Sequence, residues 1–186
     1  MSGPIAWSLG LSGLVAINPG TYVDGRGHFF EAWSRDAYAE FGIPTTFVQD
    51  NVSRSHRGVL RGLHFQRAPF AQGKLVTVLE GAIFDVAVDI RRTSDTFGQW
   101  TGVMLDIEGV RQLYIPPGFA HGFCALRTTT VVAYKCTEFY HPEAEGGIRW
   151  NAPELAINWP FFDPIVGDKD KLLPCLKDIP REQLPE

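Results

Sequence analysis

Two neighbouring strand-like segments constrain the fold of this chain more than any other feature. Residues 75–79 and 82–89 consist largely of Leu, Val, Ile, Phe and Ala, and only Glu80 and Gly81 separate them. β-Branched and aromatic residues favour extended strands, and a two-residue connection that contains glycine is typical of antiparallel strands that pair with each other. The segment 75–89 therefore predicts a β-hairpin.

Further short segments of the same kind follow one another along the chain, and turn residues separate nearly all of them. The predicted strands cover residues 14–17, 47–51, 58–66, 74–80, 82–90, 100–105, 112–115, 119–125 and 131–138. One helix is predicted over residues 34–41, because Ser34 can cap its first turn and Gly42-Ile43-Pro44 can end it. Many short strands, each with an apolar face to bury, are typical of a β-sandwich or barrel.

Length and composition predict one domain. The chain has 186 residues with 19 Gly and 13 Pro, and this length suffices to bury a core without disulfides or metal. We expect a single domain over residues 1–186, with a barrel core at about 45–140. The segment from about 150 to 186, rich in Pro and Asp, is expected to wrap around the barrel with short helical turns.

Charge and cysteine content exclude several classes of protein. A net charge of −4 and a pI near 5.7 give no basic surface for nucleic acid or an anionic membrane. No segment approaches the ~18 apolar residues of a membrane span, and the N-terminus does not resemble a signal peptide. Cys124 and Cys136 lie in apolar segments that suit reduced, buried thiols. We therefore expect a cytoplasmic protein.

Residues 58–66 place a guanidinium and an imidazole, those of Arg61 and His64, three positions apart in an otherwise apolar run. Side chains at odd separation point to opposite faces of a regular strand. The two can share a pocket only if the strand bends between them, and Gly62 makes that bend possible. Without the bend, Arg61 would face solvent and His64 would be hydrogen-bonded in the core.

Three more polar residues lie in apolar strand contexts and suggest proton chemistry together with His64. Lys74 could stabilise a developing oxyanion in a barrel interior or could be a solvated strand end. His121 could be a catalytic group or a satisfied core histidine, and Tyr134 could be part of an aromatic core. Each residue taken alone indicates little.

The sequence gives little support for a metal or nucleotide-loop mechanism. Cupin metalloenzymes place two histidines one residue apart on one strand, whereas Gln66 follows His64 and two phenylalanines flank His121. A mixed site of His64, His121 and a distant carboxylate stays open. No Gly-x-Ser-x-Gly elbow and no dinucleotide fingerprint occurs.

A series of ordered motifs resembles the dTDP-4-dehydrorhamnose 3,5-epimerase family. The motifs cover residues 24–27, 47–53, 57–66, 72–76, 84–91, 115–123, 134–137 and 157–160. The resemblance extends over about residues 14–174 and keeps the order of the family. It implies an all-β double-stranded β-helix, a jelly-roll or cupin-like barrel with short peripheral helices. It also implies a homodimer that uses no metal and no cofactor.

The resemblance further implies a substrate and four catalytic residues. The substrate would be dTDP-4-keto-6-deoxy-D-glucose, converted to dTDP-4-keto-L-rhamnose by inversion at C3 and C5. His64 would remove the proton, and Asp170 would orient its imidazole. Lys74 would stabilise the enolate oxygen, and Tyr134 would return a proton from the opposite face.

The binding residues implied by the resemblance hold the two ends of the substrate. Cationic partners for the diphosphate and the sugar would be Arg26, Arg61 and Lys169. The remaining implied residues are Phe29 and Tyr140 for thymine stacking, Glu31, Gln49 and Asn51 for hydrogen bonds, some across the dimer, and His121 beside the sugar. Glu31 and Gln49 could instead be solvent-facing strand residues.

Departures from the family pattern leave alternatives open. Residues 167–170 read Gly-Asp-Lys-Asp, so Asp168 and Asp170 both could partner His64, and we favour Asp170. Two loops, residues 67–71 and 151–153, also differ from the family. Related enzymes of antibiotic-sugar pathways invert only C3 or only C5. A keto-sugar isomerase and a non-catalytic sugar-nucleotide binding barrel are the remaining alternatives.

Overall fold

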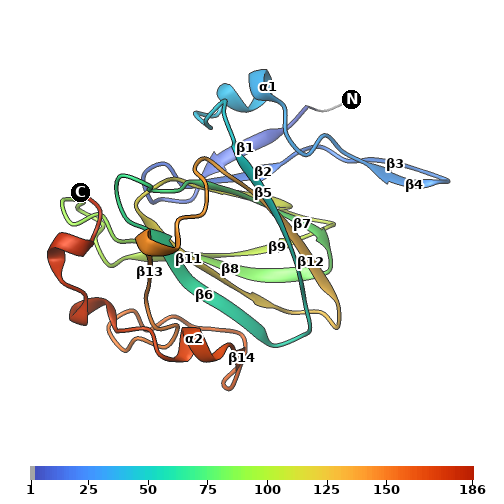
Figure 1. Ribbon diagram of the computed structural model, residues 1–186. Coiled ribbons are helices and arrows are strands. Elements are labelled where there is room, and N and C mark those ends of the chain that lie inside the picture. The colour runs from blue at the N-terminus through green and yellow to red at the C-terminus, as the bar shows by residue number, and fades with distance from the viewer. Residues whose placement is uncertain (1–2) are drawn as a thin grey trace.

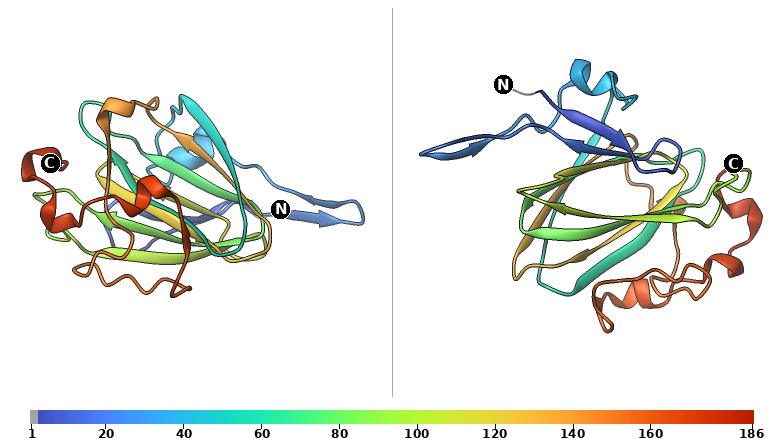
Figure 2. Two further views of the ribbon diagram at one scale, coloured as in Figure 1. Left: turned by 60° about the horizontal axis from the view of Figure 1, so that its bottom comes forward. Right: turned by 180° about the vertical axis from the view of Figure 1, so that it is seen from behind.

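The structure, a computed structural model, describes residues 3–186 and shows two β-sheets that face each other and close into a flattened barrel (Figures 1 and 2). The first sheet has the order β1 (Ile5–Ser8), β2 (Val15–Asn18), β10 (Gln112–Ile115), β7 (Lys74–Glu80), β12 (Thr130–Cys136) and β5 (Gln49–Ser55). The second has the order β13 (Glu145–Gly147), β6 (Val59–Gln66), β11 (Phe119–Ala125), β8 (Ala82–Asp89) and β9 (Trp100–Asp106), and β14 (Ile165–Val166) pairs with β6. This arrangement is the expected jelly roll.

The predicted hairpin of residues 75–89 is wrong, although both of its strands exist. β7 pairs with β10 and β12 in the first sheet, whereas β8 pairs with β9 and β11 in the second sheet. Gly81, with φ +80°, therefore turns the chain from one sheet to the other. Each of the two strands has a neighbour on both sides, so each is a buried central strand of its own sheet, and the two do not pair with each other.

The other predicted strands exist with small shifts at their ends, except that β5 begins and ends later than expected. Its inward positions are Gln49, Asn51, Ser53 and Ser55, which pair with inward positions of β12. The strand therefore directs polar side chains into the barrel interior. It lacks the alternation of apolar and polar residues by which strands are recognised in a sequence. The short strands β1, β13 and β14 were not predicted for a related reason, since they contain few buried apolar residues.

The helical segments are short. α1 spans Arg35–Ala39, shorter than predicted, and Ser34 stands at its N-cap position without a side-chain capping bond, so the predicted cap is wrong. The remaining helical turns are α2 (Asp168–Lys171) and the 3-10 turns η1 (Pro142–Ala144), η2 (Leu176–Asp178) and η3 (Arg181–Gln183). No helix among the described residues is long and apolar enough to cross a membrane.

Two apolar cores hold the layers together and leave one region of the barrel polar. One core lies between the sheets and includes Val76, Val78 and Val132. The other lies where the C-terminal segment covers the outer face of the second sheet, and Trp100 donates a hydrogen bond to the carbonyl of Leu155 there (2.7 Å). Further along β7 and β12, the inward positions change from these valines to Lys74 and Tyr134.

A two-stranded arm projects from the barrel between β2 and α1 (Figures 1 and 2). Its strands β3 (Tyr22–Asp24) and β4 (Gly27–Phe29) pair only with each other among the described strands. Tyr22, Val23 and Phe29 of the arm are exposed apolar residues. Residues 24–27 form the tip, and the two flanking strands were not predicted because their exposed residues show no burial pattern.

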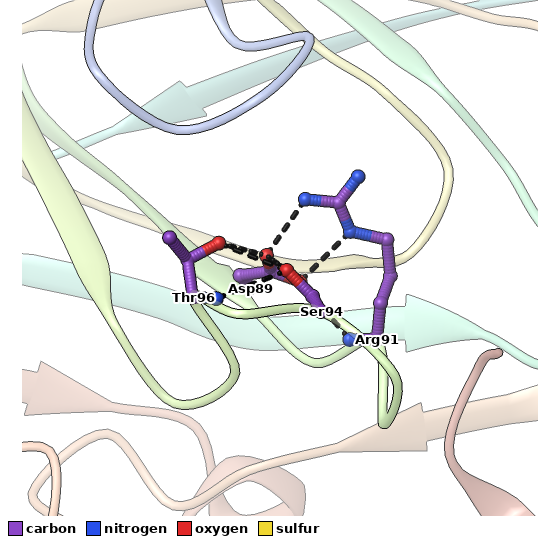
Figure 3. Close-up of polar contacts among 4 residues, drawn as sticks. All are labelled: Asp89, Arg91, Ser94 and Thr96. Atoms are coloured by element: carbon purple, nitrogen blue, oxygen red, sulfur yellow. Dashed lines mark hydrogen bonds and ion pairs between the residues drawn. The ribbon is translucent and has the colours of Figure 1, made fainter.

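Asp89 at the end of β8 organises the loop that leads to β9 (Figure 3). Its fully buried carboxylate accepts hydrogen bonds from the Arg91 backbone amide and guanidinium and from the hydroxyls of Ser94 (2.7 Å) and Thr96 (2.5 Å). Burial raises the pKa of Asp89, but these donors outweigh it and lower the pKa to about 2. The cluster therefore stabilises the fold through an ionised carboxylate.

Replacing Asp89 with asparagine is expected to lower the free energy of unfolding at pH 7 by about 2 kcal/mol, since one pKa unit corresponds to about 1.4 kcal/mol. In the wild type this contribution is present above the ordinary pKa of 3.8 and is lost as the pH falls toward 2. Denaturant titrations at several pH values measure it. Asp95→Asn, an exposed carboxylate in the same loop, is the control and should change little. Equal effects of the two variants would contradict the role of Asp89.

Candidate active site

Gly62 bends β6 where the sequence predicted a bend. His64 pairs with His121 of β11 and Arg61 pairs with Phe123, so three residue steps of β6 oppose two steps of β11. The extra residue forms a β-bulge in which Gly62 has φ +126°, a conformation open to glycine. Because the bulge interrupts the alternation, Arg61 and His64 line the same cavity.

Gly62→Ala is expected to destabilise the protein and displace His64. A Cβ at this position would lie 2.5 Å from the Cα of Gly122 and 2.8 Å from the carbonyl oxygen of His121, and neither backbone atom can move freely. We expect a loss of about 2–4 kcal/mol in the free energy of unfolding, measured by denaturant titration.

Gly58→Ala is the matched control, because Gly58 also has a positive φ (+84°) but no atom within 4 Å of the added Cβ. It should cost only the backbone strain, about 1 kcal/mol. Equal losses of unfolding free energy in the two variants would show that the close approach of β6 and β11 does not determine the cost of a side chain at position 62.

Asp170 of α2 holds both the bulge and the imidazole. Its Oδ1 lies 2.7 Å from Nε2 of His64, and its Oδ2 accepts a hydrogen bond from the amide of Gly62 (3.0 Å). Burial raises the pKa of Asp170, but the bonds from His64 and Gly62 outweigh it and bring the pKa below its ordinary value. An ionised carboxylate at Nε2 favours the tautomer with its proton there, which leaves Nδ1 as the basic nitrogen. Asp168, the other candidate, is exposed and pairs with Lys171.

Lys74 and Tyr134 reach the same space from the first sheet. Burial lowers the pKa of the Lys74 ammonium, and no ion pair to this ammonium occurs within residues 3–186. Burial also raises the pKa of Tyr134, with the nearby Cys136 acting in the same direction and Arg61 in the opposite one. Tyr134 is therefore a protonated phenol at neutral pH and can donate a proton.

His121 is part of a second histidine–carboxylate pair that sequence reasoning did not find. Its Nε2 lies 2.9 and 3.0 Å from the two carboxylate oxygens of Asp85, which is completely buried. The signal was present, because a lone aspartate interrupts the apolar run of residues 82–88 and a buried carboxylate needs a partner. The bond fixes the orientation of the His121 ring in the cavity wall.

Two cavities meet at the side chains of His64, Lys74 and Tyr134, which line both. The first cavity, of about 220 Å³, is further lined by Gln49, Asn51, Phe65, Gln66, Gln72, Tyr140 and Glu145. The second, of about 340 Å³, is further lined by Ser53, Arg61, His121, Gly122, Phe123, Gly167 and Asp170. A ligand that extends from one cavity into the other would pass against the three shared side chains.

The open end of the first cavity is built from a small polar network. Glu145 accepts hydrogen bonds from the Tyr140 hydroxyl (2.7 Å) and from Nζ of Lys169 (2.5 Å). Gln49 donates to Asn51 and accepts from the Tyr140 amide (2.9 Å), so it is not a solvent-facing residue. Glu145 was not predicted, because it lies in a Gly-rich segment without an apolar pattern.

Three of the predicted binding residues lie apart from this cluster within one chain. Arg26 is at the tip of the arm and pairs with Asp24 (2.6 Å), and Phe29 of the arm is 68% exposed. Both line a separate groove on the arm. Glu31, just after the arm, is exposed and lines neither of the two cavities.

The clustered groups can carry out proton transfer at carbon. A carboxylate-held imidazole can accept a proton, a buried ammonium can stabilise an oxyanion, and a protonated phenol can return a proton. Across residues 3–186, no three His, Cys, Asp or Glu side chains form a group that could hold a metal ion. The described residues thus provide an acid, a base and an oxyanion partner in one space.

Comparisons with known proteins agree with this chemistry. A family model described as dTDP-4-dehydrorhamnose 3,5-epimerase matches residues 8–178. The dTDP-4-dehydrorhamnose 3,5-epimerase of Methanothermobacter thermautotrophicus is 51% identical over 173 residues, which cover 91% of this chain and 93% of that protein.

Two solved structures are similar over nearly their whole length. A 3,5-epimerase of Legionella pneumophila, crystallised with dTDP-4-keto-L-rhamnose, is 49% identical with a TM-score of 0.94, and 98% of each chain is covered. NovW, a 4-keto-6-deoxy sugar epimerase from the novobiocin cluster of Streptomyces spheroides, is 38% identical with a TM-score of 0.94, and 99% of this chain and 94% of that chain are covered.

Fold and site together define a jelly-roll epimerase, an enzyme of the isomerase class. The chain belongs to the dTDP-4-dehydrorhamnose 3,5-epimerase family, which confirms the resemblance seen in its motifs.

Proposed function

We propose that this enzyme inverts C3 and C5 of dTDP-4-keto-6-deoxy-D-glucose and so produces dTDP-4-keto-L-rhamnose. One observation carries the proposal: the base and the acid come from opposite sheets, since His64 is on β6 and Tyr134 is on β12, and both line the two joined cavities. Inversion needs a proton removed from one face of a carbon and another added to the opposite face. A single base on one face would only restore the starting configuration.

In the first step, His64 takes the proton from a carbon next to the C4 ketone. The C–H electron pair moves into the ring to form an enolate, and the carbonyl oxygen at C4 becomes negative. The Lys74 ammonium stabilises that oxygen, which lowers the energy of an otherwise inaccessible carbanion. Asp170 stabilises the imidazolium that forms, because its ionised carboxylate is bonded to Nε2.

In the second step, the carbon receives the proton of the Tyr134 phenol on its other face. The enolate electrons return to form the C–H bond, and the ketone is restored. Tyr134 then regains a proton from solvent, while His64 releases its own. The same sequence at the other carbon beside C4 completes the double inversion.

The ends of the substrate would be held by the remaining polar and aromatic groups. Lys169 provides a cation for the diphosphate, Arg61 in the second cavity provides one for the sugar end, and the exposed ring of Tyr140 offers a stacking face for thymine. Gln49 and Asn51 offer amide groups in the first cavity, and His121 lies in the wall of the second.

The enzyme is further proposed to act as a homodimer in the cytoplasm, with the arm of one subunit completing the site of its partner. The arm projects from its own barrel (Figure 1). It exposes apolar side chains and carries Arg26 and Phe29, and Glu31 follows just after it. These groups suit the nucleotide end of the substrate but do not line the two joined cavities of their own chain. Three buried free cysteines suit a reducing compartment.

Mixing two inactive variants tests the arm exchange. A heterodimer of Arg26→Ala/Phe29→Ala and His64→Ala subunits should regain activity, because one site then combines an intact base with the intact arm of the other subunit. Each homodimer serves as a control. If the arm serves its own subunit, no mixed site is complete, and mixtures that exchange subunits stay inactive.

Product analysis tests the reaction itself. After incubation with dTDP-4-keto-6-deoxy-D-glucose, chemical reduction and NMR should give sugars with the L-rhamno configuration at C3 and C5. The similarity to ChmJ, a 3'-monoepimerase of Streptomyces bikiniensis (33% identical, TM-score 0.89), supports inversion at a single carbon as the second candidate. A product inverted at C3 or C5 alone would support that candidate instead.

A further inference from the structure

The inward face of β5 carries a row of four polar side chains, and one of them has no hydrogen-bond partner among residues 3–186. Gln49 bonds to Asn51 and Tyr140, and Asn51 also donates to the sulfur of Cys136 (3.5 Å). Ser55 accepts a hydrogen bond from Nε of Arg61 (3.1 Å). Ser53 lies between them, and its buried Oγ meets no hydrogen-bonding group of the described residues.

A buried hydroxyl without a partner is unfavourable, and most such groups in proteins are paired. The neighbours of Ser53 cannot supply the missing bond easily, because they are already engaged. Arg61 Nε is held by Ser55, His121 is held by Asp85, and Asp170 is held by His64 and Gly62. Ser53 lines the second cavity, and rotation of its side chain about χ1 would turn the hydroxyl toward that cavity as an available donor and acceptor.

We propose that Ser53 is a specificity-determining residue whose hydroxyl hydrogen-bonds a hydroxyl of the substrate's sugar ring. The inference rests on the proposed function. Ser53 lines only the second cavity, whereas the candidate nucleotide contacts Gln49 and Tyr140 line the first. The sugar, which reacts where the cavities meet, is the part of the substrate that reaches Ser53.

Such a bond would fix which carbon faces the base. C3 and C5 flank the C4 ketone almost symmetrically and carry their hydrogens on the same ring face, so a tilt of the ring about its C1–C4 axis brings one of these carbons nearer to His64 and moves the other away. The two sides differ because the hydroxyls at C2 and C3 lie on one side and the ring oxygen and methyl group lie on the other. A hydroxyl contact on one side therefore distinguishes the two orientations.

Ser53→Ala tests the proposal in four measurements on the same protein. Its unfolding midpoint without ligand should be unchanged or higher, because the variant removes an unpaired buried hydroxyl. Its affinity for dTDP should be unchanged, and its KM for dTDP-4-keto-6-deoxy-D-glucose should rise about 10-fold, as for one lost hydrogen bond. In D₂O, its ratio of deuterium at C3 to deuterium at C5 should differ from that of the wild type. Ser55→Ala, the neighbour with a protein partner, should instead lower the unfolding midpoint, because it removes a buried hydroxyl that is hydrogen-bonded to Arg61.

The results separate this inference from the function beneath it. If the wild type exchanges protons and the Ser53→Ala variant has the same KM and the same deuterium ratio, the proposed role of Ser53 is wrong. A variant whose only change is a lower unfolding midpoint would also overturn this role, and that result is expected if Ser53 instead holds a structural water. A wild type that exchanges no protons overturns the proposed function and this inference together.

Discussion

Replacing His64 with alanine is expected to lower turnover by about 10³-fold or more, because removal of a general base commonly costs 10²–10⁴-fold. Deuterium incorporation into the substrate from D₂O should fall in parallel, since His64 is the only side chain among the described residues that is hydrogen-bonded to Asp170. NMR of the recovered sugar measures the loss at each carbon.

The control for His64→Ala is its affinity for dTDP, which should be close to that of the wild type because the imidazole is assigned to the sugar. The variant should also fold, since His64 is partly exposed in the cavity wall. Wild-type exchange rates in a folded variant would show that another group is the base. Loss of exchange together with loss of dTDP binding would indicate a displaced site instead.

Replacing Lys74 with methionine is expected to lower kcat by about 10²–10³-fold, as removal of a single oxyanion partner does in other enzymes. The same change should raise the free energy of unfolding, because burial of an ammonium without a carboxylate partner is unfavourable. Steady-state kinetics and denaturant titration measure the two effects. A variant that loses both activity and stability would contradict this account of Lys74.

The pH dependence follows from the direction of the Lys74 shift. Burial lowers its pKa, so the ammonium loses its proton below the ordinary value of 10.5 and kcat should fall with rising pH in that range. The stability penalty is full below the lowered pKa and disappears as the pH rises from that pKa to 10.5. Lys74→Arg retains the charge at high pH and should move the alkaline limit of activity upward.

The sequence alone predicted most of the barrel because burial marks its central strands. β8 is buried at nearly every position and β11 at all, and both appear as apolar runs. Pairing was harder to predict than strand position. Residues 75–79 and 82–89 looked like a hairpin, but a short turn can also carry the chain between two sheets, and only the positions of β9 to β12 decide between the two.

The site was predicted in part by physical reasoning and in part by resemblance. The bend at Gly62 followed from the need to bring Arg61 and His64 to one face, and the bulge confirms it. The partner of His64, 106 positions away along the chain, was favoured only through the family motif. Asp85 and Glu145 were missed, because a carboxylate in a strand does not indicate which distant donor it meets.

Other expectations stay predictions. The single domain over residues 1–186 is one of them, and the roles of the site residues and the dimer are tested by the experiments described above. The arm shows why the dimer could not be predicted from the residue pattern. All residues of β3 and β4 are exposed within one chain, so neither the hydrophobic pattern nor the packing of one subunit indicates what the arm contacts.

The most direct test of the central claim is the number of solvent deuterons that the enzyme places in dTDP-4-keto-6-deoxy-D-glucose in D₂O without a reductase. Mass spectrometry and NMR count and locate them. Two deuterons, at C3 and C5, with both centres inverted, are the result that this account predicts. One deuteron would make the enzyme a monoepimerase, and none would contradict proton transfer by His64 and Tyr134 on this substrate.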